Sequence, residues 1–229
     1  MNILKVKPVL CFLFLFLLFN QNSFCQEEIK IKFIGNCGLH LSDGQLDLFV
    51  DFPYKSGAYG YMEYKDTELQ NIPNNSIFFY THKHADHYSR KIVNNVLKEK
   101  KGIKFSQWQT KKLVEYFDKI LDIDLQVFKT KHRFSLNHKS YLLTWHGKKI
   151  YLSGDTEHAE TISKIKDLDW AFVPYWILLD ANEKDIKIDA KMIGIYHIAT
   201  VQIPSIKENS NDIQHIKPMI NQGEVIVIK

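Results

Sequence analysis

The chain has 229 residues, of which 45% are hydrophobic and 24% charged, and its formal net charge is +4. No basic tract and no basic-aromatic stripe is present, so the charge gives no indication of a nucleic-acid partner. No internal repeat or low-complexity linker divides the chain, which excludes repeat architectures.

Residues 1–25 are predicted to be a cleaved secretory signal peptide. Lys5 and Lys7 give a positively charged start, and the apolar run Val9–Phe19 is too short to span a bilayer comfortably. Small residues occupy the −3 and −1 positions before a cut at Gln26. We therefore expect an exported protein, periplasmic or secreted, with no stable membrane span after cleavage.

Two alternatives to a cleaved signal remain at this stage. One is a short membrane anchor. The other is lipidation of Cys25, as in bacterial lipoproteins, which the preceding Asn22-Ser23-Phe24 disfavours because it is a poor lipobox. Cleavage would leave Cys37 as the sole cysteine, which excludes an internal disulfide. Cys37 is interpreted as a buried small hydrophobe, since no pattern places a base beside it.

Residues 26–229 are long enough for one domain with a sizeable core. Alternating or continuous apolar runs predict strands in the first half at Ile29–Phe33, Leu46–Val50, Ile77–Tyr80 and Ile103–Phe105. Helical spacing predicts helices at Ile92–Leu97 and Leu113–Leu121. The turn sequence Ser42-Asp43-Gly44 separates the first two strands, and Tyr54–Tyr64 is expected to be a loop near the functional site.

The second half continues the mixture of strands and helices. Strands are predicted at Leu125–Phe128, Ser140–Thr144, Ile150–Leu152, Trp170–Val173, Ile193–Tyr196 and Glu224–Ile228. Helices are predicted at Ala159–Ile165 and Ile213–Ile220, the latter despite Pro218, and a loop at Trp176–Lys187. This alternation favours an α/β layered domain over a sandwich or a bundle.

Four side chains that can bind a metal follow the buried strand that ends at Tyr80. They are His82, His84, Asp86 and His87, in the sequence Thr81-His-Lys-His-Ala-Asp-His87. Imidazole nitrogens and carboxylate oxygens are the ligands that suit zinc and neighbouring first-row metals. The position also favours a site, because the ends of strands are where open α/β sheets carry ligands. The alternative is a polar loop that is rich in histidine by chance.

Three more residues of ligand type lie at or near the ends of predicted strands: His132, Asp155 and His197. Distant positions that meet at one sheet edge are what a buried metal site requires. Two divalent ions about 3.5–4 Å apart can share a bridging hydroxide and a bridging carboxylate. Such metals lower the pKa of bound water to roughly 7 and so supply a nucleophile at neutral pH.

The motif His82-x-His84-x-Asp86-His87, followed by His132, Gly154-Asp155 and His197, resembles the metallo-β-lactamase fold superfamily. The resemblance covers Ile29–Lys229 and implies an αββα four-layer sandwich with the metals at one edge of the two sheets. Asp51 resembles the family's early strand-end aspartate, which usually contacts the metal ligands and not the metal itself. No inserted nuclease domain and no flavin domain follows, so the RNA-processing and electron-transfer branches do not fit.

The resemblance also implies a ligand set and a cofactor. His82, His84 and His132 would bind a first metal; Asp86, His87 and His197 would bind a second; Asp155 would bridge them. The cofactor would be two divalent ions, zinc in the first place and manganese or iron otherwise, and Asp86 would also position the bridging hydroxide. An aspartate at the bridging position resembles the family's hydrolases of esters, lactones and phosphodiesters, whereas common β-lactamases carry cysteine there.

The predicted activity is therefore hydrolysis of an ester, lactone, thioester or phosphodiester bond in a small-molecule substrate. The short loops resemble the compact, lactonase-like branch. His138 is an alternative to His132 as a ligand; otherwise it could polarise a substrate oxygen or be a surface residue. His158, Tyr175 and Trp176 are candidates for the pocket wall.

Two other functions fit the same residues. The first is a mononuclear iron oxygenase or oxidoreductase on the same fold, which would need redox-active iron with open coordination positions. The second is a non-catalytic surface-binding protein, which would have no need of seven matching ligands.

Overall fold

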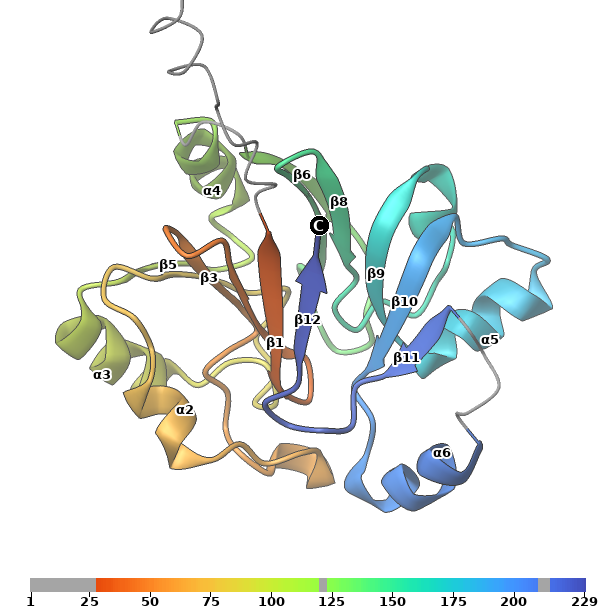
Figure 1. The fold of residues 1–229 in the computed structure, drawn as a ribbon, viewed down its shortest axis with the longest axis horizontal. Helices are drawn as coiled ribbons and strands as arrows, with labels where there is room; N and C mark the ends of the chain where they lie inside the picture. Colours follow the sequence, from red (N-terminus) through yellow and green to blue (C-terminus); the bar gives the residue numbers. More distant parts are fainter. Residues whose placement is uncertain (1–27, 120–122, 210–214) are drawn as a thin grey trace, which may run out of the picture.

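The computed structural model describes residues 28–119, 123–209 and 215–229, and its twelve strands form two six-stranded sheets (Figure 1). The predicted signal peptide and its cleavage site lie outside these residues, so export stays a prediction. No helix of the described ranges is long and apolar enough to cross a membrane.

The first sheet has the strand order β12-β1-β2-β3-β4-β5. Its strands are β12 (Val225–Ile228), β1 (Ile29–Gly35), β2 (Gly38–Ser42), β3 (Asp47–Val50), β4 (Ile77–Phe79) and β5 (Ile103–Phe105). Pairing is antiparallel from β12 to β3 and parallel from β3 to β5. Because β3 and β4 are parallel, the residues after both strands leave the sheet at the same edge.

The second sheet has the order β11-β10-β9-β8-β7-β6. Its strands are β11 (Ile216–Pro218), β10 (Ala190–Tyr196), β9 (Leu168–Pro174), β8 (Lys148–Leu152), β7 (Lys139–Trp145) and β6 (Ile123–Lys129). Strands β8 to β11 are parallel, and β7 runs antiparallel to both β6 and β8. The carboxyl ends of β6, β8 and β10 therefore lie at one edge.

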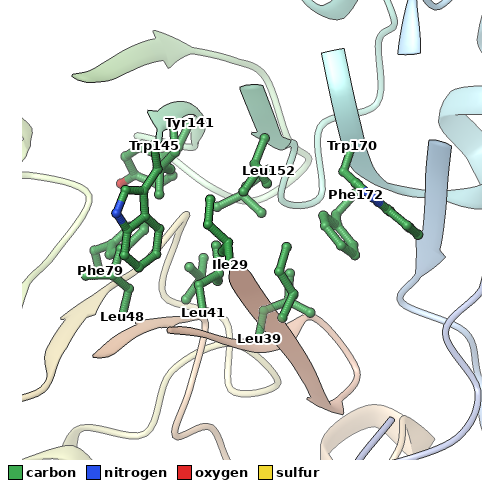
Figure 2. Packing of buried hydrophobic residues seen from close by; sticks show 14 of the residues in the cluster. Ile29, Leu39, Leu41, Leu48, Phe79, Tyr141, Trp145, Leu152, Trp170 and Phe172 are labelled. Carbon is green, nitrogen blue, oxygen red and sulfur yellow. The ribbon is translucent and has the colours of Figure 1, made fainter. Parts of the chain in front are cut away.

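The main core lies between the two sheets. Figure 2 shows Ile29, Leu39 and Leu48 of the first sheet facing Trp145, Leu152 and Phe172 of the second, all fully or almost fully buried. Strand β1 buries every second residue at its start, which is the period of a strand with one face on the core. Sheet-on-sheet packing of this kind supplies the rigid edge on which a site can be built.

Helices cover the outer faces of both sheets (Figure 1). On the first sheet α3 (Arg90–Lys100) buries Val93 and Val96 against Phe78, and on the second α5 (Tyr175–Glu183) buries Ile177 and Ala181. The other helices are α2 (Asp66–Gln70), α4 (Thr110–Phe117), α6 (Ile203–Asn209), and the 3-10 turns η1 (Ala58–Gly60), η2 (Ile162–Lys164) and η3 (Thr200–Gln202). The predicted αββα four-layer arrangement is confirmed.

Two predicted helices are wrong. The described part of Ile213–Ile220 is the strand β11, in which Ile216 pairs with Ile193 of β10. Pro218 cannot sit inside a helix without losing a backbone hydrogen bond, but an edge strand tolerates it. Ala159–Ile165 forms only the 3-10 turn η2.

The expected loop at Trp176–Lys187 is also wrong, because its residues up to Glu183 belong to the helix α5. Strand β2 and the helices α2 and α6 were not predicted. Helix α4 ends at Phe117, and residues 120 and 121 of its predicted extension lie outside the described ranges.

Candidate metal centre

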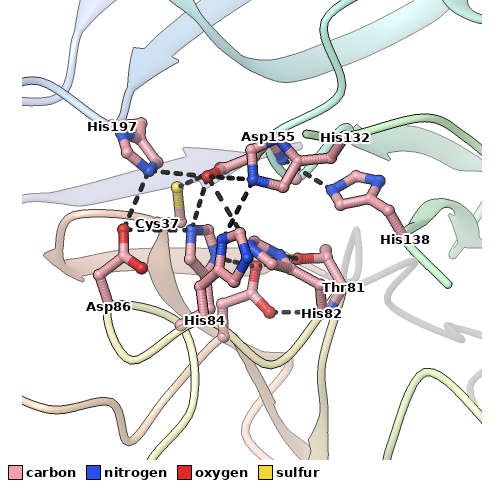
Figure 3. Close-up of polar contacts among 12 residues, drawn as sticks. Cys37, Thr81, His82, His84, Asp86, His132, His138, Asp155 and His197 are labelled. Atoms are coloured by element: carbon pink, nitrogen blue, oxygen red, sulfur yellow. Dashed lines mark hydrogen bonds and ion pairs between the residues drawn. The ribbon is translucent and has the colours of Figure 1, made fainter. Parts of the chain in front are cut away.

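All seven predicted ligands come from loops that leave the two sheets at the same edge. The His82–His87 cluster follows β4, and His132, Asp155 and His197 follow β6, β8 and β10. The common direction of these strands brings residues from both halves of the chain together. Figure 3 shows His197 and Asp86 on one side of the Asp155 carboxylate and His132 on the other.

A first group of donors consists of His82, His84 and His132. One ring nitrogen of each lies within 4.8 Å of the others. Nε2 of His132 is 3.2 Å from Nδ1 of His84. Three imidazoles that converge in this way can hold one metal ion.

A second group surrounds Oδ2 of Asp155. Nε2 of His87 lies 3.0 Å from this oxygen and Nε2 of His197 lies 2.9 Å from it. Oδ2 of Asp86 completes the group at 3.2 Å from Nε2 of His197 and 3.6 Å from Nε2 of His87. The same Asp155 oxygen is 3.8 Å from Nε2 of both His82 and His132. Asp155 therefore lies between the two groups.

Two of the donor nitrogens lack the hydrogen-bond partner that a buried nitrogen normally has, as expected of ligands to a metal. Nε2 of His82 and Nε2 of His197 are buried, and neither has a hydrogen-bond partner in the described part of the chain. Ligands about 2.0–2.1 Å from a tetrahedral metal lie about 3.3 Å apart, close to the separations observed here. The donor set can thus hold metal ions.

The imidazoles of His82 and His87 are also held through their other nitrogen. Nδ1 of His87 donates to Oδ2 of Asp51 over 2.9 Å, and Nδ1 of His82 lies 3.0 Å from Oγ1 of Thr81. Asp51 in turn accepts hydrogen bonds from N and Oγ1 of Thr81 at 2.8 and 2.7 Å. These contacts fix the tautomers so that the Nε2 lone pairs of His82 and His87 point into the site.

Of the remaining rings only His84 has such a contact, because Nδ1 of His132 and Nδ1 of His197 have no hydrogen-bond partner among the described residues. Nε2 of His84 lies 3.4 Å from the carbonyl oxygen of Phe134. Nδ1 of His132 lies 3.5 Å from Oε1 of Glu157. His84 therefore presents Nδ1 to the site, whereas His132 presents Nε2.

Protons compete with metal for this site. Burial opposes a charge on His87, but the carboxylates of Asp155 and Asp51 outweigh it and raise the pKa of His87 well above its ordinary value. Burial acts against the charge of Asp155 too, yet the rings of His197 and His87 lower the pKa of this carboxyl. Ligands must shed such protons before a cation binds, so metal binding releases protons.

His138 lies behind Asp155 and does not line the site's cavity. Its Nε2 accepts a 2.9 Å hydrogen bond from the backbone N–H of Asp155, and its Nδ1 lies 2.7 Å from Oγ1 of Thr130. Burial lowers the pKa of His138 to about 3, so the ring is neutral. With both nitrogens occupied by the protein, His138 has none free for a metal or a substrate oxygen, and its contacts are those of a residue that positions Asp155.

Two neighbours of the site had no signal in the sequence. The buried Cys37 thiol lies 3.7 Å from Oδ1 of Asp155. Its burial, and to a smaller degree the nearby carboxylates, raise the pKa of Cys37, so the side chain stays a thiol. Nδ2 of Asn36 donates to the backbone oxygen of Asp86 at 2.9 Å and to its Oδ2 at 3.3 Å. Asn36 thus orients Asp86, and only the turn between β1 and β2 brings it there.

A cavity of about 500 Å³ opens over the donors. Its walls beyond the donors are formed mainly by Tyr59, Tyr61, Arg133, Phe134, Glu157 and Trp176. The ring of Tyr61 lies 4.0 Å from that of His197, and the ring of Trp176 lies 5.1 Å from it. The expectation that the 54–64 loop and Trp176 border the site agrees with this geometry, whereas Tyr175 and His158 are not among the lining residues.

Solved structures with the metallo-β-lactamase fold resemble this chain over most of its length. Igni18, a metallo hydrolase from Ignicoccus hospitalis, covers 88% of this chain and 99% of its own, with 14% identity and a TM-score of 0.64. YhfI, a metallo-β-lactamase fold protein from Bacillus subtilis, covers 88% of this chain and 99% of its own, with 13% identity and a TM-score of 0.63. A proposed metal-dependent hydrolase from Parabacteroides distasonis covers 86% of this chain and 94% of its own, with 22% identity and a TM-score of 0.60.

No model of a known protein family matches the sequence, and no curated protein matches it. At these identities the similarity establishes the fold, and the chemistry has to be argued from the site.

Proposed function

We propose that this chain, which has the metallo-β-lactamase fold, is a hydrolase that holds two divalent cations. His82, His84 and His132 would hold one cation, and Asp86, His87 and His197 the other, with Asp155 between them. The observation that carries the proposal is the position of Asp155 Oδ2, which lies 2.9–3.8 Å from ring nitrogens of both groups. Two of the similar solved structures are described as metal-dependent or metallo hydrolases, which supports the class of reaction.

When bound, the two cations would supply an activated water at neutral pH and would polarise a carbonyl or phosphoryl oxygen. Residues of the chain would position the water and the bridging carboxylate relative to the two cations. Asp86 accepts a hydrogen bond from Asn36 at Oδ2 and lines the cavity, so it would help to hold its cation and to position the attacking water. The His138–Asp155 hydrogen bond keeps the Asp155 carboxylate aimed between the two donor groups.

The cavity wall provides for binding of the substrate. Tyr61 borders the cavity, and burial together with Asp155 raises the pKa of Tyr61 to about 12, so its phenol stays protonated and can donate a hydrogen bond to a substrate oxygen. The aromatic rings of Tyr59, Phe134 and Trp176 favour a substrate with an apolar part. The reaction class that fits is cleavage of an ester, lactone, thioester or phosphodiester.

Zinc is the proposed metal. A donor set of five imidazoles and two carboxylates suits zinc and also accepts manganese or iron. Elemental analysis of protein purified with and without oxygen distinguishes these metals. A single redox-active iron with oxygen-dependent turnover would overturn the hydrolase proposal in favour of an oxygenase.

The proposal is tested by comparing His84→Ala with Lys83→Ala. Nδ1 of His84 belongs to the first donor group, whereas Lys83 in the same loop is exposed. We expect His84→Ala to lose metal and hydrolytic rate together on a panel of lactones, thioesters and phosphodiesters, while Lys83→Ala keeps both. Full turnover by His84→Ala would refute the assignment.

A further inference from the structure

Of the four most exposed large hydrophobic side chains of the described residues, two line the metal-site cavity and two belong to segments that border it. Leu136 is 91% exposed, Val201 87%, Phe134 86% and Tyr59 71%. Phe134 and Tyr59 line the cavity itself. Val201 is tied to the Tyr59 side of the mouth, because Oγ1 of its neighbour Thr200 donates to the oxygen of Gly60 over 3.2 Å. Exposed apolar groups that cluster in this way mark an interaction site.

Phe134 is held outward by a strained backbone. It has φ 61°, in the left-handed region that a bulky side chain rarely adopts, within a tight turn closed by Ser135 N–H donating to the His132 oxygen at 3.1 Å. Glycine or asparagine would adopt this conformation more readily. Strain and exposure combine at one aromatic residue, and together they point to a role for the ring itself.

The same loop and the strand ends that flank it are strongly basic. Residues 129–139 contain Lys129, Lys131, Arg133 and Lys139 and no acidic residue. None of these four cations forms an ion pair within the described ranges, and the guanidinium of Arg133 lies 4.9 Å from the centre of the Phe134 ring. The carboxylate of Glu157 receives the Arg133 backbone N–H and lies near His132, so it contacts the base of the loop. Apolar side chains that project beside unpaired cations match an anionic amphiphilic surface.

We propose that the segment 131–136, called here the docking loop, binds the surface of an anionic lipid bilayer. Phe134 and Leu136 would enter the interfacial layer, while Lys131 and Arg133 contact headgroup phosphates. Tyr59 and Val201 would face the same surface across the cavity mouth. Uptake of a substrate from this bilayer would depend on the proposed hydrolase activity. Binding to the bilayer does not depend on that activity.

The test is co-sedimentation of the chain from Gln26 onward, which contains every described strand and the whole described core, with lipid vesicles. We expect at least about tenfold stronger binding to phosphatidylcholine vesicles with roughly one-third phosphatidylglycerol than to phosphatidylcholine alone. Binding should weaken when NaCl rises from about 50 to about 500 mM, because salt screens the cations. The double variant Phe134→Asn/Leu136→Ser should lose about tenfold or more in affinity for the anionic vesicles.

Two controls separate this loss from misfolding. Phe134→Asn suits the left-handed backbone, so the double variant should keep its thermal midpoint and its metal content. Val225→Thr/Val227→Thr removes two exposed apolar side chains from the edge strand β12 and should bind vesicles like the wild type. The proposal is overturned if the wild type ignores anionic vesicles, if the loop variant binds them equally well, or if the chain is a dimer that the loop variant dissociates.

Discussion

At the scale of single residues, the geometry of the metal centre depends on the atoms behind the donors. Asp51 holds His87, Thr81 holds His82, and His138 holds the backbone of Asp155. Such supporting contacts fix the orientation of a ligand, so their loss weakens metal binding without removing a ligand.

Replacement of His138 tests its positioning role. His138→Ala removes the acceptor for the Asp155 N–H and the donor to Thr130, so we expect metal affinity to fall by about 10–100-fold. His138→Gln offers an acceptor and a donor of similar reach and should retain most of the affinity. The measurement is competition with a chromogenic chelator, and equal affinities for the two variants would contradict the role.

His138 should also make the metal-free protein sensitive to acid. Burial lowers the pKa of His138 to about 3 in the folded state, below its ordinary value of 6.5. Between these values the unfolded chain binds a proton at this residue that the folded chain does not, so the contribution of His138 to stability is full above pH 6.5 and falls as the pH decreases, by about 1.4 kcal/mol per unit. Urea unfolding from pH 7 to 4 measures the slope, which His138→Gln should reduce.

At the scale of elements, the turn after β8 (Lys148–Leu152) decides where Asp155 points. Gly154 has φ +58°, and a Cβ there would lie 2.7 Å from Nε2 of His138 and 2.7 Å from Cβ of Thr81. Both neighbours are buried and hydrogen-bonded, so neither can withdraw at little cost. The turn therefore requires glycine, and the requirement comes from the support of the metal centre.

Gly154→Ala should consequently damage both stability and metal binding. Positive φ costs about 1–2 kcal/mol for a residue with a Cβ, and overpacking adds about 1–3 kcal/mol. We expect the free energy of unfolding to fall by at least about 2 kcal/mol. Gly147→Ala is the matched control, because Gly147 also has positive φ but nothing within 4 Å of its Cβ position. A loss of metal in Gly154→Ala alone would support the argument, and equal behaviour of the two would contradict it.

At the scale of the whole molecule, the first sheet supplies four of the seven donors and the second sheet supplies three. The first sheet brings the His82–His87 cluster after β4, and the second brings His132, Asp155 and His197. Neither half can hold the proposed pair of cations without the other. Metal binding therefore should stabilise the packing of the sheets against each other as well as the site.

Removal of metal should lower the thermal midpoint in one cooperative transition. A ligand present at about 100 times its dissociation constant stabilises by about 2.7 kcal/mol, which corresponds to roughly 5–10 °C for a chain of this size. Calorimetry with and without chelator measures the shift. His84→Ala should melt low and show no response to chelator; two separate transitions would indicate that the sheets unfold independently.

The sequence alone determined the class of fold and the candidate donors. Alternating apolar residues identified β1 (Ile29–Gly35) and β3 (Asp47–Val50), and His82-x-His84-x-Asp86-His87 after a buried run stands out because four donors are local in the chain. Local periodicity is sufficient for such features, since one strand or one loop contains the whole signal.

Only the tertiary structure decided the features that depend on contacts between distant segments. His132 and His138 are both histidines of one loop, and they differ only in whether Nε2 faces the donors or the Asp155 backbone. The strand at Ile216–Pro218 forms because β10 offers it a pairing edge, which overrides its helical spacing. The cavity wall of Tyr59, Phe134 and Trp176 has no local period, because its residues meet through the packing of the two sheets.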